Sequence, residues 1–211
     1  MSFFVTLEGP EGSGKSTLIP RLAEFLSGRG YDVVQTREPG GTDISHQIRT
    51  VVLDPAHENM HPATEFLLFS AARAQLVAEV IRPHLERGGI VLCDRFADSS
   101  LAYQGAGHGL DVETVRAVTE FATGGLRPDL TLLFDLDVEK GLARRQSGGA
   151  KWDRLDGETL EFHRRVRKCF LELAAEEPDR WVVVNADRSV SVVEAEVRAI
   201  LTEHIEARAA G

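Results

Sequence analysis

Residues 3–16 read Phe-Phe-Val-Thr-Leu-Glu-Gly-Pro-Glu-Gly-Ser-Gly-Lys-Ser. The apolar run Phe3–Leu7 is short and rich in aromatic and β-branched residues, which predicts a buried strand. Apolar residues at helical spacing predict a helix over Thr17–Leu26. The segment between them fits the pattern G-x-x-x-x-G-K-[ST], at Gly9, Gly14, Lys15 and Ser16. The stretch therefore predicts a strand, a glycine-rich loop and a helix in succession.

This succession is typical of a binding site for a nucleoside triphosphate. Backbone N–H groups of a glycine-rich turn, with the positive end of a helix behind them, form a cavity for phosphate oxygens. We expect Lys15 to reach the β- and γ-phosphates of ATP and Ser16 to ligate Mg²⁺. An ordinary glycine-rich turn is the alternative. The predicted ATP contacts in this stretch are Gly9, Glu11, Gly12, Ser13, Gly14, Lys15, Ser16 and Thr17.

Composition limits the partners of the chain. It has 211 residues, 43% hydrophobic and 27% charged, the usual composition of a globular protein in water. No apolar run reaches the length of a membrane span and no export signal is recognisable, so we expect no membrane partner. The net charge of −9 argues against a nucleic-acid partner. Cys93 and Cys169 lack metal-ligand spacing and are expected to be packed thiols in a reducing cytoplasm.

Apolar runs and turn residues divide the chain into further elements. The predicted strands are Phe3–Leu7, Tyr31–Thr36, Ile90–Cys93, Leu130–Leu136 and Trp181–Asn185. The other predicted helices are Ile44–Leu53, Ala63–Glu86 with a kink at Pro83, Val112–Ala122, Val138–Arg145, Gly157–Glu176 and Val190–Arg208, and Gly105–Gly109 is expected to be a turn or flexible loop. Five apolar strands that alternate with helices predict a parallel sheet covered on both faces, a three-layer α/β fold. Because no repeat or linker divides the chain, we expect one domain, residues 1–211.

Two features narrow the class of nucleotide-binding protein. The guanine-reading sequence N-K-x-D and the D-x-x-G of nucleotide-dependent switches are absent from the sequence. The strand that begins at Ile90 runs into Asp94-Arg95, an acid beside a base, whereas motor and pump ATPases usually have paired acids there. Ligands bind at the carboxyl ends of parallel strands, and an arginine at that edge suits a second anion.

A pair of side chains in the long helix suggests what carries that anion. Phe69 and Arg73 are four residues apart and share a face of a helix that is otherwise nearly free of charge. An aromatic ring beside a guanidinium can stack on a nucleobase and donate hydrogen bonds to its carbonyl oxygens. A surface arginine whose stem covers apolar neighbours remains the alternative.

With these residues in view, the chain resembles the bacterial type of thymidylate kinase over nearly its whole length. The matching segments, in order, are 8–16, Thr36–Thr42, Leu68–Arg73, Asp94–Phe96, Ser99–Gly105, Asp153-Arg154 and Asn185–Asp187. The resemblance implies a P-loop NTPase fold with a mobile lid at about residues 144–155. It also implies the usual homodimer of this family, packed on helices such as the one that begins at Ala63.

The resemblance assigns roles to single residues. For dTMP, it implies that Glu11 faces the 3′-hydroxyl, Phe69 stacks on thymine, Arg73 bonds its carbonyl edge, and Tyr103 walls off the 2′ position. Ser100 and Gln104 flank the base, and Pro39 and Ser99 belong to the same site. Arg37 and Arg95 hold the acceptor phosphate, and Asp94 orients Mg²⁺ through water. Ala186 contacts ATP.

The chain departs from the family pattern in two places. Phe96 stands where Tyr or His is frequent, so a hydroxyl role is absent there. The loop 9–16 has no arginine, so transition-state charge must be met from the lid, where Arg144, Arg145, Lys151 and Arg154 cluster. Arg154 is our candidate for the β/γ bridge, with Arg144 or Arg145 against adenine. A merely solvated run of charge is the alternative.

The sequence thus predicts a cytoplasmic, Mg²⁺- and ATP-dependent kinase that phosphorylates dTMP to dTDP, with Lys15, Asp94, Arg95 and Arg154 as its catalytic groups. Another nucleoside monophosphate kinase is the alternative of the same chemistry, and a nucleotide-dependent switch or binding module is the alternative of another class. No general base is expected, because the acceptor phosphate has a second pKa near 6. We assign no role to His163, expect His108 to be solvated, and expect Asp137 to cap a helix as readily as to act in catalysis.

Overall fold

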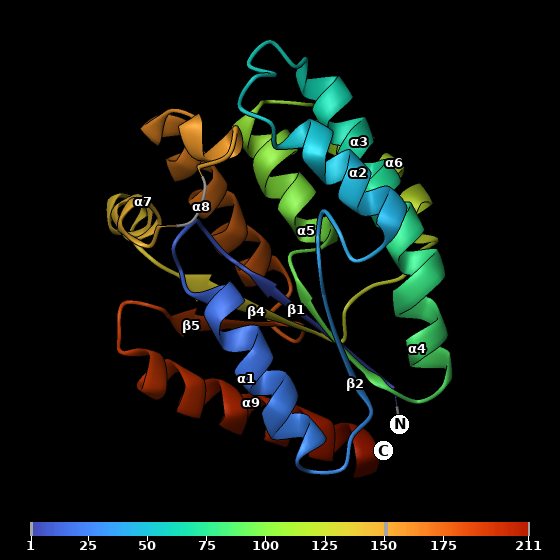
Figure 1. Ribbon diagram of the computed structural model, residues 1–211. Helices are drawn as coiled ribbons and strands as arrows, with labels where there is room; N and C mark the ends of the chain where they lie inside the picture. Colours follow the sequence, from blue (N-terminus) through green and yellow to red (C-terminus); the bar gives the residue numbers. More distant parts are fainter. Residues whose placement is uncertain (1, 150–151, 211) are drawn as a thin grey trace.

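The structure is a computed structural model that describes residues 2–149 and 152–210. Its centre is a five-stranded sheet in the order β2-β3-β1-β4-β5, in which every neighbouring pair is parallel (Figure 1). The strands are β1 (Phe3–Glu8), β2 (Val33–Arg37), β3 (Ile90–Asp94), β4 (Leu130–Asp135) and β5 (Trp181–Asn185). The predicted parallel sheet is confirmed, and each strand lies within one or two residues of its predicted bounds.

Helices cover both faces of this sheet, because successive side chains of a strand point to opposite faces. Val5 and Leu7 of β1 face α1 (Lys15–Ser27) and α9 (Val190–Ala210), whereas Phe4 packs under the helical segment that follows Pro62. The further helices are α2 (Asp43–Val52), α3 (Pro62–Leu76), α4 (Arg82–Glu86), α5 (Ala97–Ser100), α6 (Val112–Thr123), α7 (Val138–Ser147) and α8 (Leu160–Glu176). The predicted three-layer arrangement is therefore present.

The edge strands differ from the prediction that every strand is apolar and buried. Gln35 and Arg37 of β2 are exposed, and so is Val183 of β5. The central strands β1, β3 and β4 are buried at nearly every position. An edge strand is covered on one side only, so its sequence tolerates polar residues.

The long helix predicted over Ala63–Glu86 is present but changes its winding. A π-helical segment, η1 (Val77–Ile81), separates α3 from α4. Pro83 has no N–H for the carbonyl four residues before it, and its ring crowds that carbonyl. The wider π-helical turn just before Pro83 fits this loss of one hydrogen bond.

The prediction of a flexible loop over Gly105–Gly109 is wrong for most of its length. Leu101–Gly107 forms a buried π-helical segment, η2. A Cβ on Gly107 would come within 2.5 Å of the Phe162 ring, so glycine serves here for close packing of η2 on α8. Arg165 of α8 donates to the carbonyls of Ala106 and Gly107, which fixes the segment further.

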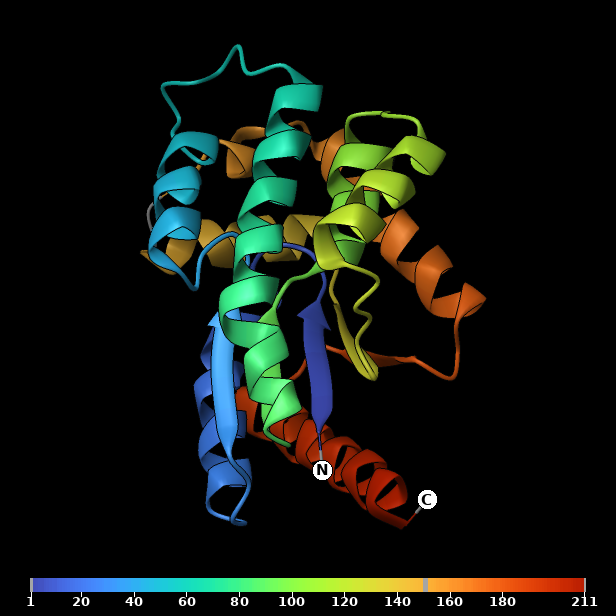
Figure 2. The same ribbon diagram turned by 90° about the vertical axis from the view of Figure 1, so that its right-hand side faces the viewer.

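The arrangement gives the molecule a functional end. Both termini lie at the end of the sheet where β1 begins, and β1 and β2 point away from them (Figure 2). Among the described residues, no helix is long and apolar enough to cross a membrane. Because β1 runs into the glycine-rich loop, this loop lies at the opposite end of the sheet, at the carboxyl ends of the strands, where it meets the lid.

Candidate active site

A cleft of about 360 Å³ opens at these carboxyl ends. One wall is the loop after β1, Glu11–Thr17, and another carries Phe69, Tyr103 and Gln104. Most of the predicted site residues line it: Glu11, Gly12, Ser13, Gly14, Lys15, Ser16, Thr17, Arg37, Pro39, Phe69, Asp94, Arg95, Ser99, Tyr103, Gln104, Arg144 and Arg145. Gly9, Arg73, Ser100, Arg154 and Ala186 lie outside this lining.

The glycine-rich loop has the conformation that its pattern predicts. Gly9, Gly12 and Gly14 all have φ between 68° and 134°, the left-handed region that favours glycine. A Cβ on Gly9 would also come within 2.5 Å of the Phe134 carbonyl oxygen of β4. Gly14 then leads into α1, whose amino end points its free N–H groups at the cleft. The ordinary-turn alternative does not account for this cradle.

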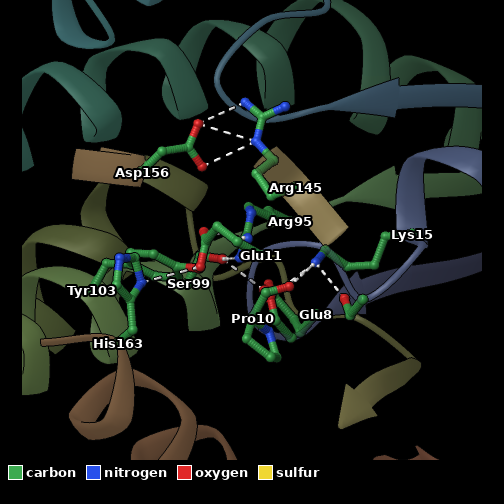
Figure 3. Close-up of polar contacts among 12 residues, drawn as sticks. Glu8, Pro10, Glu11, Lys15, Arg95, Ser99, Tyr103, Arg145, Asp156 and His163 are labelled. Carbon is green, nitrogen blue, oxygen red and sulfur yellow. Dashed lines mark hydrogen bonds and ion pairs between the residues drawn. The ribbon is translucent and has the colours of Figure 1, made fainter. Parts of the chain in front are cut away.

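Lys15 folds back across the loop. Its Nζ donates to the carbonyls of Gly9 and Pro10 and to Ser13 Oγ, each at 2.9 Å (Figure 3). The side chain is buried, and burial together with the nearby Arg95 guanidinium lowers the pKa of Lys15 to about 8. A phosphate group at the loop would supply the negative charge that this ammonium lacks.

Ser16 and Asp94 meet beside the loop, although they are 78 positions apart in the chain. The Ser16 hydroxyl donates to Asp94 Oδ2 at 2.7 Å. Hydroxyl and carboxylate oxygens are the donors that Mg²⁺ prefers, together with phosphate oxygens and water. Within the described residues, no cluster of three or more His, Cys, Asp or Glu side chains forms a separate metal site. The pair fits a cation that is held jointly with a phosphorylated ligand.

Glu11 is the centre of a buried polar network (Figure 3). Its Oε1 accepts from Arg95 at 3.0 Å and from the Tyr103 hydroxyl at 2.5 Å, and Oε2 lies 3.4 Å from His163 Nδ1. Burial by itself raises the pKa of Glu11, but Arg95 and the hydrogen bonds outweigh it and hold that pKa well below its usual range. The buried His163 belongs to this network through its contact with Glu11. The sequence did not indicate this role of His163.

Arg95 itself has an unusual backbone. Its φ of 69° is left-handed, which is costly for a residue with a side chain. Such strain is typical of functional positions, where the surrounding fold imposes the conformation. Here it directs the guanidinium over the Tyr103 ring, 4.8 Å from its centroid, and onto Glu11.

Arg73 lies beneath the cleft rather than on its surface. Its guanidinium is 1% exposed and pairs with Glu38 at 2.6 Å, and it also donates to Ser100 Oγ and the Phe96 carbonyl. The alternative of a surface arginine is therefore wrong. Ser100 is equally buried, so Phe69 and Gln104 are the predicted base-contacting side chains that border the cleft.

Arg49 is a cleft residue that the sequence did not indicate. It belongs to α2, lines the cleft with Arg37, and donates to the Pro39 carbonyl at 2.9 Å. Burial, with the charge of Arg37, lowers the pKa of Arg49 to about 10. A helix that carries one arginine among polar residues gives no local signal of such a role.

The last turn of α7 enters the lid, and the amino end of this helix is capped by Asp137, as expected. A Cβ on Gly12 would collide with the Gly141 carbonyl, and one on Gly141 with the Glu11 carbonyl, so α7 touches the loop backbone to backbone. Arg144 donates to the Ala186 carbonyl at 3.0 Å. These contacts attach α7 to the loop and to the segment after β5.

The other lid arginines have different partners. Arg145 donates to both carboxylate oxygens of Asp156, from Nε to Oδ1 at 3.0 Å and from Nη2 to Oδ2 at 2.7 Å (Figure 3). Arg154 donates to the Val52 carbonyl at 3.0 Å and pairs with the buried Glu65. A merely solvated run of charge is thus wrong for these two arginines. Lys151 lies outside the described residues.

Known proteins share this arrangement and sequence. The family model described as thymidylate kinase matches residues 7–197. The chain belongs to the thymidylate kinase family. The predicted family, and with it the ATP-dependent phosphorylation of dTMP to dTDP, is confirmed.

The individual relatives are similar to this kinase over nearly their whole lengths. A thymidylate kinase of Deinococcus radiodurans is 56% identical over 95% of this chain and 96% of its own. One of Roseiflexus sp. is 51% identical over 97% and 96%. The crystal structure of thymidylate kinase from Ehrlichia chaffeensis, 32% identical, covers 95% of this chain and 98% of its own with a TM-score of 0.78, which confirms the predicted fold.

Glu8 is a further buried acid of the kinase that the sequence left without a role. Its carboxylate oxygens accept from the Phe96 N–H at 2.8 Å and the Ser99 hydroxyl at 2.6 Å. Burial, with the nearby Asp98 charge, raises the pKa of Glu8 to about 7. Glu8 therefore supports the backbone on either side of the acceptor end of the cleft.

This pKa predicts a pH-dependent loss of stability. The folded state holds the Glu8 proton more tightly than the unfolded chain, whose value is 4.5, so the free energy of unfolding falls as pH rises from about 4.5 to about 7. Glu8→Gln removes this titration. Urea denaturation should show the variant gaining about 3 kcal/mol on the wild type between pH 4.5 and 8. A difference that stays constant with pH would contradict the assignment.

Proposed function

We propose that this kinase binds ATP and dTMP end to end in the cleft, so that the γ-phosphoryl group passes from ATP to an oxygen of the dTMP phosphate. The observation that carries this proposal is the composition of one cleft: the loop Glu11–Thr17, the cations Arg37 and Arg95, and the ring of Phe69 all line it. The first part suits a triphosphate, the second a monophosphate and the third a base.

Positive charge is the main contribution of the protein to this reaction. Two anionic phosphates must approach each other, and positioning with electrostatic stabilisation supplies most of the catalysis in phosphoryl transfer. Lys15 serves the donor phosphates, and Arg37 and Arg95, with Arg49 beside them, serve the acceptor phosphate. The acceptor is already largely deprotonated near neutral pH, so the site needs no general base.

Ser16 and Asp94 are the residues that would hold Mg²⁺. Their oxygen donors fit this cation, as described above. When bound, the ion offsets negative charge on the β- and γ-phosphates. The residues themselves keep the donor phosphates in register with the loop. Glu11 and Tyr103 in turn face the deoxyribose, with Pro39 and Ser99 in the same acceptor site.

We retain Arg154 as the lid arginine that reaches the β/γ bridge. For this it has to leave Glu65, whereas Arg145 and Arg144 already line the cleft and suit the adenine. Arg154→Met is expected to lower kcat by roughly 10³-fold, which is the effect of losing an arginine that stabilises the transition state in other phosphoryl-transfer enzymes. Arg145→Met should instead raise the KM for ATP. Steady-state kinetics of both variants distinguish the roles, and the reverse pattern would transfer the catalytic role to Arg145.

The proposed reaction is tested with a panel of acceptors. ADP formation by the wild type should require a nucleoside monophosphate and be fastest with dTMP. Equal turnover of dAMP or dUMP would favour the broader nucleoside monophosphate kinase. ADP formation that does not depend on any acceptor would favour the switch or binding module.

We also propose a single cytoplasmic domain that forms a homodimer. Phe121 of α6 is 89% exposed and Leu67 of the neighbouring α3 is 57% exposed, and exposed apolar side chains of this size are typical of interfaces. The free thiols Cys93 and Cys169 suit a reducing compartment.

The dimer predicts a specific effect of charge at Phe121. Phe121→Asp places a carboxylate on an exposed position, so the chain should fold and run as a monomer in size-exclusion chromatography with light scattering. Val192→Asp, at an exposed position of α9, is the matched control and should stay dimeric. A wild type that is monomeric at all concentrations would exclude the interface.

A further inference from the structure

Apart from its ion pair with Arg154, Glu65 has no place in the mechanism above, although its carboxylate is fully buried in the first turn of α3. Gln104 Nε2 donates to its Oε1 at 2.7 Å, and His108 Nε2 lies 3.2 Å from the same oxygen. Arg154 pairs with Oε2. The expectation of a solvated His108 is thus wrong. Partners from two segments far apart in sequence, residues 104–108 and Arg154, thus converge on one carboxylate of α3.

Arg154 supplies a counter-charge to this carboxylate, which favours its ionised form. Burial by itself raises the pKa of Glu65, but hydrogen bonds from His108, Arg154 and Gln104 outweigh burial and lower it. An ionised carboxylate has only acceptor oxygens. Gln104 must therefore turn its NH₂ group to Glu65, and its amide oxygen lies on the other side of the carboxamide.

The orientation of the amide matters because Gln104 lines the cleft, as Phe69 does, whereas Glu65 is buried outside the lining. Thymine has an N–H donor at N3, between two carbonyl oxygens. Cytosine has an acceptor lone pair at N3. An amide oxygen in the cleft accepts from the thymine N3–H and is repelled by the cytosine lone pair.

We propose that Glu65 is a positioning residue that fixes the orientation of the Gln104 carboxamide and thereby makes the acceptor site select bases with an N3–H donor. This inference rests on the proposed function, because it deepens the account of the acceptor site. A carboxamide without such a partner can rotate by 180° and exchange its donor and acceptor ends. Glu65 prevents that exchange.

The test uses Glu65→Gln, whose side chain has the same shape but can also donate, so that it accepts both orientations of Gln104. Calorimetry measures the Kd of dTMP, of its 5-methyl-dCMP analogue, which differs only at N3 and C4, and of dUMP, which lacks only the methyl group. The dTMP preference over 5-methyl-dCMP should fall about tenfold or more. The preference for dTMP over dUMP should stay within about twofold, because the Watson–Crick edge is unchanged.

The matched control is Glu172→Gln, the same exchange at an exposed acid of α8 that does not line the cleft. It should keep the wild-type preference for dTMP over 5-methyl-dCMP. If the buried Arg154 prevents Glu65→Gln from folding, Glu65→Gln/Arg154→Met removes that unpaired charge and is measured instead.

An unchanged preference in the Glu65 variants, with all three ligands weakened equally, would reduce Glu65 to a structural role and overturn the inference. The proposed function fails differently: the wild type would then form no ADP in response to dTMP. The wild-type assay thus separates the two failures.

Discussion

Replacement of Lys15 by methionine is expected to lower kcat by at least about 10³-fold, with dTMP binding nearly unchanged. The ammonium is the cation of the loop, with Nζ 2.9 Å from two loop carbonyls and Ser13 Oγ. Methionine keeps the apolar stem and removes the charge. Steady-state rates and calorimetry with dTMP check the two parts of this prediction. The control is Lys168→Met, at an exposed position of α8, which should stay within about twofold of the wild type.

The same residue predicts how ATP binding depends on pH. Burial and Arg95 lower the pKa of Lys15 to about 8, so the free kinase loses this charge above that value. Because ATP binding requires the Lys15 ammonium, the affinity of the kinase for ATP should fall as pH rises through 8. Lys15→Met should abolish that fall.

A Lys15→Met variant that retained more than a tenth of the wild-type turnover would exclude Lys15 from the transfer step.

Arg73→Met is the second change with a large expected effect, on stability. It leaves the Glu38 carboxylate buried without its counter-charge, 2.6 Å from where the guanidinium was. Breaking a buried ion pair in this way costs about 3–5 kcal/mol of the free energy of unfolding. Urea denaturation measures the loss, and dTMP titration should show weaker binding, because Arg73 also holds Ser100 and the Phe96 carbonyl.

The double variant Glu38→Met/Arg73→Met is the matched control. It removes both charges and fills the space with apolar atoms, an exchange that is often neutral for stability. We expect it to regain most of the lost stability without regaining dTMP affinity. If the double variant were as unstable as Arg73→Met, the uncompensated charge would not be the cause.

Much of the fold could be predicted because its signals are local. The strand, loop and helix of residues 3–26 are contiguous, and each central strand is an unbroken apolar run. The side chains that resisted prediction have partners far along the chain: Arg73 bonds Glu38 across 35 positions, and Arg154 reaches Glu65 across 89. A charged residue inside an apolar helix is a local signal, and it could have indicated Glu65 as it indicated Arg73. The neighbouring sequence does not show, however, which residue pairs with either charge.

The site shows the same division. Lys15, Ser16 and Asp94 belong to segments whose spacing indicates phosphate chemistry, and they lie together in the cleft. Arg49 and His163 belong to no such segment, and only the packing of α2 and α8 brings them to the site. The role of Arg154 depends on where the lid lies, which residue spacing does not determine.

The close approach of Gly12 and Gly141 limits how the lid can swing. Because the backbones of the loop and α7 are in contact there, Gly141 cannot move away from the loop without opening a gap, and we expect the lid to pivot about it. Arg145 is only four residues after Gly141, about 6 Å along the helix, so a rotation about Gly141 moves it only a short way. Arg154 follows Gly148 and Gly149 and lies farther along the chain from Gly141, so we expect it to move farther than Arg145 when the lid moves.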